Sequence, residues 1–327
     1  MEIFKSVEEI EKQSKRVILT IGTFDGIHKG HDKLIDTVID FSKKEDASPW
    51  VFTFSNLPYE IFNPEINHYR LIDIESKTCV LSKKGIEGLI LIDFTKNFGK
   101  LNGIDFFRSL REKFVSLKIV VGYDFRMGRG SSISASDLEE ISKLDDFEIH
   151  IVPPIKEDGQ KISSTWIRSL IKQGDIKKAN ALLARPYFIT GKVEKREGKG
   201  SEIGFPTANI RNSKMVYPKP GVYLTKVQIA GDENNEFGQP VYEKEYYSGM
   251  TFVGKSNLSF QNPPAVETNI FDFSGNLYNK NIKVYFLKRI REIIKLENFD
   301  ELRNQLIKDK EECLSLLKKP EEIDVNY

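Results

Sequence analysis

Over its first half, the sequence alternates short apolar runs with segments of helical periodicity, and this alternation restricts the possible fold more than any other feature. The apolar runs are β-rich and continuous, which is typical of strands buried on both faces of a parallel sheet. We expect such strands at 17–21, 50–54, 89–92, 119–121 and 147–152. Residues 16 to about 183 therefore predict a doubly wound α/β domain.

After Arg185-Pro186 the pattern changes to β segments separated by turn residues, at 187–193, 221–229, 246–253, 266–273 and 282–287. These segments predict a small antiparallel barrel. We interpret the charged run 230–245 as a long hairpin loop and 300–317 as a closing amphipathic helix. A chain of 327 residues exceeds a usual single core. We therefore expect two domains, 1–184 and 185–327.

Three local signals predict helix ends in the first half. The stretch 136–139, SDLE, has the spacing of a capping box and predicts a helix that starts at Ser136. Gly174 predicts the end of another helix, and Asp175 can cap the short helix that follows it.

Charge and cysteine content exclude several classes of protein. Lys and Arg total 49 against 48 Asp and Glu, so a formal charge of +1 provides no global field for nucleic acid or an anionic membrane. Cys79 and Cys313 are too few for a disulfide framework or a Cys-based zinc site. The apolar runs are far shorter than a bilayer span, and residues 1–16 are charged. We expect a cytoplasmic protein that binds neither nucleic acid nor membranes, and its oligomeric state stays open.

The ten residues 22–31, GTFDGIHKGH, lie where the first predicted strand gives way to an amphipathic helix. Helix N-termini bind anions through free N–H groups, and His28 and His31 add donors there. Alone, the histidines could be a surface pair. Two further segments accompany them, 121–128 (VGYDFRMG) after a later strand and 162–168 (ISSTWIR) at a helix start. Alone, these would be a plain turn and an ordinary N-cap.

In this order, the three segments resemble the nucleotidyltransferase module of bifunctional riboflavin kinase/FAD synthetase, a Rossmann-like α/β domain. The resemblance implies that the ATP phosphates and departing pyrophosphate are held by His28, His31, Ser164, Thr165 and Arg168. It extends the nucleotide site to Gly22, Phe24, Asp25, Gly30, Gly122, Asp124, Phe125, Gly128 and Ser163. The attacking FMN phosphate is already ionised, so positioning and charge stabilisation suffice, with His28, His31 and Arg168 as catalytic residues.

The chain departs from this family pattern after the second predicted strand. Family members usually read Thr-Phe-Asp-Pro-His-Pro there, whereas residues 53–58 read TFSNLP, so Ser55 and Leu57 replace an acid and a histidine. Trp166 stands where an arginine is common. An alternative is therefore a monofunctional riboflavin kinase with a weakened or inactive adenylyltransferase domain. A flavin- or nucleotide-binding regulator without turnover is the alternative outside enzymes.

The second half carries its own glycine-rich segment, 198–209, GKGSEIGFPTAN. On a strand, Thr207 and Asn209 face the same side, and their neutral oxygens suit Mg²⁺ together with substrate phosphates. The segment resembles the flavokinase motif. This implies ATP binding by Gly198, Lys199, Gly200, Gly204, Phe205, Pro206, Thr207 and Asn209, with Thr207 and Asn209 as metal ligands.

Phosphoryl transfer to a riboflavin hydroxyl requires a group that accepts the hydroxyl proton. Glu267, in AVETNIFDF, aligns with the acid that the family uses as base, and Arg291 would lie near the flavin. Residues 249–256, GMTFVGKS, satisfy the spacing of a P-loop. Bulky Phe252 and Val253 and the later Pro263-Pro264 contradict that structure, so we interpret this match as coincidence.

Together, the two resemblances imply one transferase with a front FMN adenylyltransferase (FAD synthetase) domain and a rear riboflavin kinase domain. It would use ATP at two sites with Mg²⁺, and riboflavin, FMN and FAD would be its substrates and products.

Overall fold

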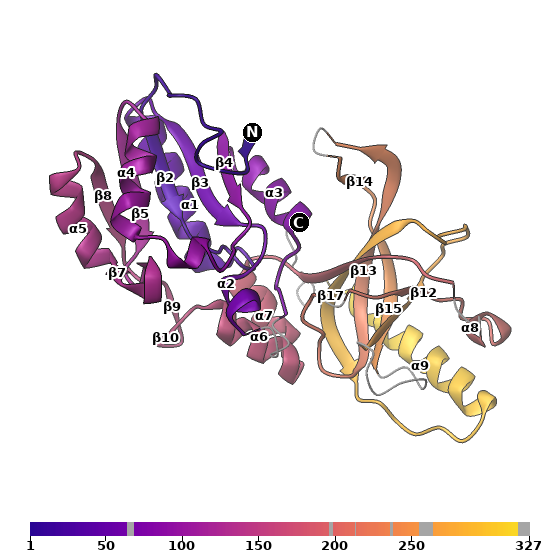
Figure 1. Ribbon diagram of the computed structural model, residues 1–327. Coiled ribbons are helices and arrows are strands. Elements are labelled where there is room, and N and C mark those ends of the chain that lie inside the picture. The colour runs from indigo at the N-terminus through magenta and orange to yellow at the C-terminus, as the bar shows by residue number, and fades with distance from the viewer. Residues whose placement is uncertain (64–68, 196–198, 213, 236–237, 255–263, 320–327) are drawn as a thin grey trace. The chain divides into compact units, whose positions relative to one another are not determined.

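The computed structural model describes residues 1–63, 69–195, 199–212, 214–235, 238–254 and 264–319 (Figure 1). By its contacts, the chain divides into two compact units, Met1–Ser163 and Ser164–Tyr327. Helices α6 (Ser164–Gln173) and α7 (Ile176–Leu183) group with the second unit in this division. The domain boundary at residues 184–185 stays a prediction.

The first unit contains a parallel sheet of six strands in the order β1-β4-β3-β2-β5-β8. Their bounds are β1 (Glu2–Phe4), β2 (Val17–Ile21), β3 (Ser48–Phe54), β4 (Gly88–Ile92), β5 (Leu117–Gly122) and β8 (Glu148–Val152). The five expected strands are confirmed. Sequence reasoning missed β1 because three residues are too short to display a period. The chain passes from β2 to β3 and β4 and then returns to β5 on the other side of β2. The carboxyl ends of the adjacent strands β2 and β5 therefore form a topological switch point.

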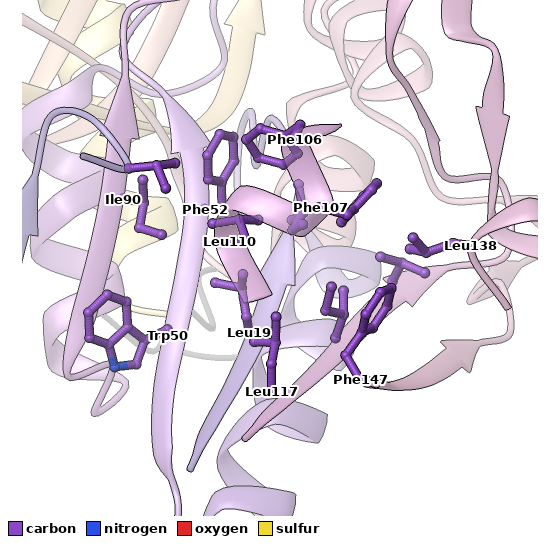
Figure 2. Close-up of a cluster of buried hydrophobic side chains, with 14 of the residues drawn as sticks. Leu19, Trp50, Phe52, Ile90, Phe106, Phe107, Leu110, Leu117, Leu138 and Phe147 are labelled. Carbon is purple, nitrogen blue, oxygen red and sulfur yellow. The ribbon is translucent and has the colours of Figure 1, made fainter. Parts of the chain in front are cut away.

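Helices cover both faces of this sheet. Because parallel crossovers are right-handed, the reversal of direction places α1 (Lys29–Lys44) on one face and α4 (Gly103–Lys113) and α5 (Ala135–Leu144) on the other. The side chains agree, since Leu19, Phe52 and Phe107 share a core with α4 and α5 (Figure 2). Ile18 and Val38 belong to a separate core on the α1 face. The doubly wound arrangement is thus confirmed.

Shorter elements complete the first unit. Between β3 and β4 lie α2 (Pro58–Phe62) and α3 (Ile74–Lys83). The remaining elements are the 3₁₀ turns η1 (Phe98–Lys100) and η2 (Arg129–Ser131) and the short strands β6 (Arg126–Met127), β7 (Ile133–Ser134), β9 (Lys156–Glu157) and β10 (Gln160–Lys161). In the described part of the chain, no helix combines the length and apolar character needed to cross a bilayer.

The helix ends show one wrong prediction and two confirmed ones. Helix α5 is capped by Ser134, not Ser136, and the capping box joins Ser134 to Asp137. Both serines fit the pattern, but β7 ends at Ser134 and leaves it the extended backbone that a cap requires. Gly174 ends α6 with a φ of +87°, and the Asp175 side chain caps α7, as expected.

The second unit contains an antiparallel sheet in the order β11-β17-β13-β15-β16-β12, with β14 paired to β13. Its strands are β11 (Tyr187–Lys192), β12 (Ala208–Ile210), β13 (Gly221–Asn234), β14 (Pro240–Tyr242), β15 (Tyr247–Gly254), β16 (Ala265–Ile270) and β17 (Asn281–Arg291). A bridge from Glu194 to Asn209 joins the two ends of the order, so the sheet curls into a half-barrel. Helix α9 (Phe299–Leu317), drawn in yellow in Figure 1, packs on β15 and β17.

Two segments of this unit differ from the sequence-based expectation, and a third, the P-loop match, has the strand structure that its interpretation as a coincidence requires. The run 230–245 is not one long loop, because β13 continues to Asn234 and pairs with β14, a backbone interaction that its charged composition conceals. Strand β16 ends at Ile270 because Asp272 adopts a left-handed turn with φ of 53°. The P-loop match lies on β15, which pairs on both sides as a regular strand, and its last two residues fall outside the described residues.

Candidate functional site

The two histidines predicted to bind phosphate, His28 and His31, meet at the N-terminus of α1, beside the switch point between β2 and β5. His28 is the N-cap, and its Nδ1 accepts a hydrogen bond from the His31 backbone N–H at 3.3 Å. Neutral His28 therefore carries its proton on Nε2, the tautomer that can donate to an oxyanion. The two rings stack with centroids 3.7 Å apart. A Cβ at Gly30 would lie 3.1 Å from the His28 ring, so glycine makes room for this arrangement.

The loop between β2 and these histidines is strained. Phe24 and Ile27 have φ values of 47° and 40°, and Gly26 between them has a φ of 89°. Both non-glycine residues are fully buried, and each left-handed residue costs roughly 1–3 kcal/mol. The Phe24 ring meets His31 edge to face at 5.2 Å. Surrounding packing thus holds the loop in one conformation, as is common at ligand-binding segments.

Gly22 and Asp25 tie the same loop to its neighbours. The Gly22 N–H donates to the Phe52 carbonyl of β3 at 3.1 Å. Asp25 is buried, and its Oδ1 accepts the Leu71 N–H at 2.8 Å. The Asp25 carboxylate thus holds the loop after β2 to the backbone of Leu71, and its role in nucleotide binding stays a prediction.

The second predicted segment follows β5, on the other side of the switch point. The Phe125 N–H closes a turn on the Gly122 carbonyl at 2.9 Å. Gly128 has a φ of +81°, and a Cβ there would lie 3.4 Å from the Gly103 Cα. Asp124 forms an ion pair with Lys161 on β10. Ile162 follows Lys161, and its carbonyl oxygen would lie 3.8 Å from a Cβ placed on Gly30. The third segment therefore begins beside the first turn of α1.

The residues of that third segment fall in both units. Ser163 ends the first unit, and Ser164, Thr165 and Arg168 lie on α6, which opens the second. Thr165 is exposed, whereas Ser164 and Arg168 are half-buried. That they share one phosphate site with the histidines stays a prediction.

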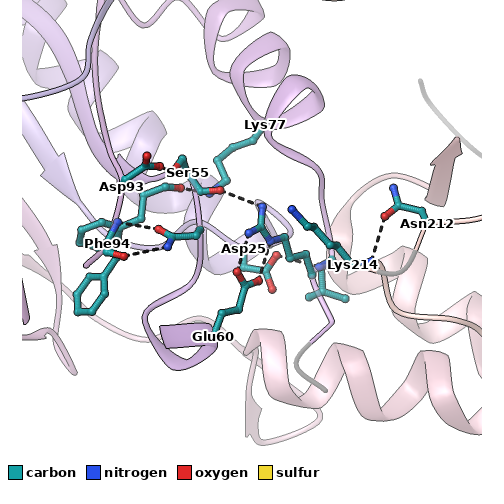
Figure 3. Close-up of polar contacts among 12 residues, drawn as sticks. Asp25, Ser55, Glu60, Lys77, Asp93, Phe94, Asn212 and Lys214 are labelled. Atoms are coloured by element: carbon teal, nitrogen blue, oxygen red, sulfur yellow. Dashed lines mark hydrogen bonds and ion pairs between the residues drawn. The ribbon is translucent and has the colours of Figure 1, made fainter. Parts of the chain in front are cut away.

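Residues 55–57, which depart from the family pattern after β3, have structural roles in the first unit (Figure 3). The Asn56 side chain donates to the Phe94 carbonyl at 2.9 Å and accepts the Phe94 N–H at 2.7 Å. Ser55 Oγ donates to Asp93, and Leu57 is only 3% exposed. The segment therefore fastens the loop after β3 to the loop after β4.

In the second unit, the glycine-rich segment folds back on itself. Gly198 lies outside the described residues, and Lys199 and Gly200 belong to the one-turn helix α8 (Lys199–Glu202). The Phe205 N–H donates to the Gly200 carbonyl at 2.7 Å. A Cβ on Gly200 would lie 2.4 Å from the Phe205 carbonyl oxygen, so the close approach requires glycine. Gly204 adopts a φ of +83° in this turn.

The predicted metal ligands and base lie side by side. The Asn209 amide donates to Thr207 Oγ1 at 3.2 Å, which confirms that the two side chains face the same side. Asn209 pairs directly with Glu267 across β12 and β16, so their Cβ atoms are about 4.5–5.5 Å apart. Asn209 Oδ1 is buried and accepts no hydrogen bond from the described residues. This orphaned oxygen and the Thr207 hydroxyl form a donor set that fits Mg²⁺.

A cavity of about 380 Å³ opens on the other face of the same two strands. Its volume lies in the range of small-molecule sites. Ala208 and Thr268, which are paired across β12 and β16, both line it, and Thr207 joins it to the Asn209–Glu267 face. The lining residues are Val193, Pro206, Thr207, Ala208, Thr268, Ile270, Phe273, Gly275, Asn276, Leu277 and Tyr278.

Arg291 has a different environment from the one expected beside a flavin. Its Nε and Nη2 donate to the two carboxylate oxygens of Asp309, both at 2.7 Å, and Asp309 is 1% exposed. Gln305 donates to the same carboxylate at 2.8 Å. The guanidinium thus anchors α9 to the end of β17, and flavin binding by Arg291 stays a prediction.

Sequence reasoning missed two residues that shape these sites. Asn269 donates to the Pro206 carbonyl at 2.8 Å and so holds the glycine-rich segment against β16. Its signal was available, because Glu267 and Asn269 share one face of a strand. Lys77, on α3, is buried against the loop after β2 and the C-terminal end of β3. Only its tertiary contacts distinguish it from other helix lysines.

Comparison with known proteins covers both units. A family model described as FAD synthetase matches residues 10–166, and one described as riboflavin kinase matches residues 183–317. The bifunctional riboflavin kinase/FMN adenylyltransferase of Bacillus subtilis is 30% identical over 317 residues, which cover 93% of this chain and 94% of that protein. The protein of the same name from Haemophilus influenzae is 30% identical over 312 residues, 95% of this chain and 97% of that protein.

A solved structure shares the whole architecture. The crystal structure described as a macrolide-efflux protein from Streptococcus pneumoniae has a TM-score of 0.81 and 31% identity over 95% of this chain and 97% of that chain. With the identity and coverage of the relatives above, these matches establish that the chain belongs to the family of bifunctional riboflavin kinase/FMN adenylyltransferases.

Proposed function

We propose that this chain phosphorylates riboflavin to FMN at its second unit and adenylylates FMN to FAD, with release of pyrophosphate, at its first. The observation that carries the kinase assignment is the strand pairing of Asn209 with Glu267, with the Asn209 amide on Thr207. This pairing gathers oxygen ligands and a carboxylate on one face of the half-barrel. Membership of the family and the match of both family models support the two activities.

In the kinase reaction, the riboflavin hydroxyl attacks the γ-phosphorus of ATP, and ADP leaves. Glu267 accepts the hydroxyl proton as the new P–O bond forms. The nucleotide occupies the cavity beside Thr207 and Thr268, which directs its phosphates toward the Asn209–Glu267 face. Thr207 and Asn209 hold Mg²⁺, which when bound neutralises charge on the phosphates. The turn between Gly200 and Phe205 leads directly into Pro206 and Thr207, which line the cavity.

In the adenylyl transfer, the ionised phosphate of FMN attacks the α-phosphorus of ATP, and pyrophosphate leaves. No base is required, so the task of the protein is to orient the two phosphates and to stabilise the charge on the departing group. His28, through Nε2–H, His31 and the N-terminal N–H groups of α1 supply donors for this purpose. Ser164, Thr165 and Arg168 complete the set.

The monofunctional alternative rests on the segment 55–57. Because these residues carry structural contacts instead of an acid and a histidine, the adenylyl step depends on the remaining donors. The test is chromatographic separation of flavins after incubation with ATP, Mg²⁺ and either riboflavin or FMN. FAD from both substrates supports the bifunctional proposal, whereas FMN from riboflavin and no FAD from either supports the monofunctional one.

Two substitutions assign the activities to their units. Glu267→Gln should lower FMN formation at least 100-fold, an order of magnitude typical of a lost general base, and leave FAD formation from FMN intact. His31→Ala should do the reverse. The matched controls are Glu233→Gln and His150→Ala, which alter exposed residues of the same type in the same units. A parallel loss of both activities in either variant would contradict independent sites.

A further inference from the structure

We propose that Lys77 is a positioning residue of the adenylyltransferase site: its ammonium clamps the loop that carries the phosphate-binding histidines to the C-terminal end of β3. This inference rests on the proposed function of the first unit. Lys77 Nζ donates to the Thr23 carbonyl at 2.8 Å and to the Phe54 carbonyl at 3.2 Å, and it lies 3.5 Å from Thr53 Oγ1 (Figure 3). The ammonium thus joins the loop after β2 to the last two residues of β3.

The position of the clamp relates it directly to the strained loop. Thr23 immediately precedes Phe24, the first of the left-handed residues that lead to His28. Fixing the Thr23 carbonyl fixes the peptide plane from which that strained turn departs. Thr53 Oγ1 donates to the same carbonyl at 3.1 Å, so two donors hold one oxygen. A loop that must keep two buried residues at positive φ needs such restraint to stay in one conformation.

The charge on Lys77 is buried but balanced. Lys77 is only 4% exposed, and its pKa is lowered to about 8. Burial lowers this pKa, and the nearby carboxylate of Asp25 offsets part of the effect. The other charged groups that face it are Arg70 and Glu60. Arg70 is itself held by two hydrogen bonds to Glu60 at 2.7 and 2.6 Å and donates to the Ser55 carbonyl at 2.9 Å. Two cations and two anions therefore surround the ends of the strands.

The contacts distinguish positioning from direct ligand binding. Lys77 has three N–H donors, and its neighbours within hydrogen-bond distance are two backbone carbonyls and one threonine hydroxyl. The hollow beside it, lined by Asp25, Asn56 and Arg70 among others, holds about 10 Å³, enough for one water and too little for a phosphate. Lys77 therefore acts on the substrates through the backbone of the loop after β2 and of the end of β3.

The test compares FAD formation from FMN in Lys77→Met with that in Lys83→Met, which removes an exposed lysine from the same helix. We expect kcat/KM to fall about 10–100-fold in Lys77→Met only, mainly through kcat, because the loop carries the donors used in the transition state. Riboflavin kinase activity of the same molecules should not change. Equal FAD formation in the two variants would overturn the proposal.

A pH profile separates the clamp from a merely structural lysine. Wild-type FAD formation should decline with a midpoint near pH 8, where Lys77 loses its proton, and Lys77→Arg should retain activity well above that pH because a guanidinium stays charged. An alkaline limb that is unchanged in Lys77→Arg would refute the proposal, because the charge at position 77 would then not control FAD formation. If the wild type forms no FAD at any pH, the proposed function itself fails, which is a distinct result.

Discussion

The pair Arg291–Asp309 permits a quantitative test of what holds the C-terminal helix. Asp309 is 1% exposed and receives both arms of the guanidinium at 2.7 Å, while the Arg291 side chain is 21% exposed. Removing one partner of a buried pair costs about 3–5 kcal/mol, since the other charge is left without compensation. Because Arg291 retains some access to water, we expect Asp309→Asn to cost about 3 kcal/mol, near the lower end of that range.

In a unit of this size, about 3 kcal/mol lowers the Tm by roughly 6–12 °C. Urea and thermal unfolding can be followed by tryptophan emission, because Trp166 lies in the second unit and Trp50 in the first. The matched control is Glu292→Gln, which removes a pair with Lys219 whose side chains are 71% and 44% exposed. That control should cost under about 1 kcal/mol.

A double-mutant cycle gives the decisive number. The cycle compares Arg291→Met and Asp309→Leu, each alone, with the variant that carries both. Because the double variant removes both charges, it should be less destabilising than the sum of these two single changes by about 2 kcal/mol or more. Additive effects, or an Asp309→Asn cost no larger than that of the control, would refute the buried-pair reasoning. If Arg291→Met instead raises KM for riboflavin without loss of stability, the flavin-binding prediction for Arg291 gains support over the anchoring one.

Two further predictions follow from buried polar groups. The hydroxyl of Thr251 lies 2.8 Å from that of Thr225 and 2.9 Å from that of Thr268, which lines the cavity. Thr251→Val leaves both neighbours without this partner, so urea unfolding should show a loss of about 1–3 kcal/mol and kinase kinetics a higher KM for ATP. An unchanged KM would exclude a role for these three hydroxyls in nucleotide binding. The pKa of Lys77 is about 8 in the folded protein against an ordinary 10.5, so between these pH values the folded first unit binds fewer protons than the unfolded chain. Its free energy of unfolding should therefore rise from pH 8 to pH 10.5 by about 3 kcal/mol relative to that of Lys77→Met. An identical pH dependence of unfolding in the two proteins would contradict the lowered pKa.

Much of the fold could be predicted because its determinants are local. The apolar runs at 17–21 and 50–54 become β2 and β3, and the turn signals at Gly174 and Asp175 lie where the chain turns. The predictions that failed depended on pairings that local sequence does not display: the charged run 230–245 conceals the pairing of β13 with β14, and two serines compete to cap α5. Ser134 and Ser136 offer the same cap, and only the strand pairing before α5 decides between them.

The candidate sites divide in the same way. Sequence alone located His28 and His31 at a strand-to-helix junction, and it predicted that Thr207 and Asn209 face one side of a strand. The shared side is confirmed, although β12 begins at Ala208 and Thr207 immediately precedes it. The sequence also placed Glu267 by resemblance, but the register that sets Glu267 opposite Asn209 joins segments nearly sixty residues apart.

Only tertiary structure could assign Lys77 and Arg291. By sequence, Lys77 is one lysine of a helix and Arg291 a basic residue at the end of a strand. In the folded protein, buried Lys77 clamps the Thr23 and Phe54 carbonyls. Arg291 pairs with buried Asp309 and so anchors α9 to β17. A side chain's type and local spacing determine which element it sits on, whereas its energy and role depend on the groups that folding brings within hydrogen-bonding distance.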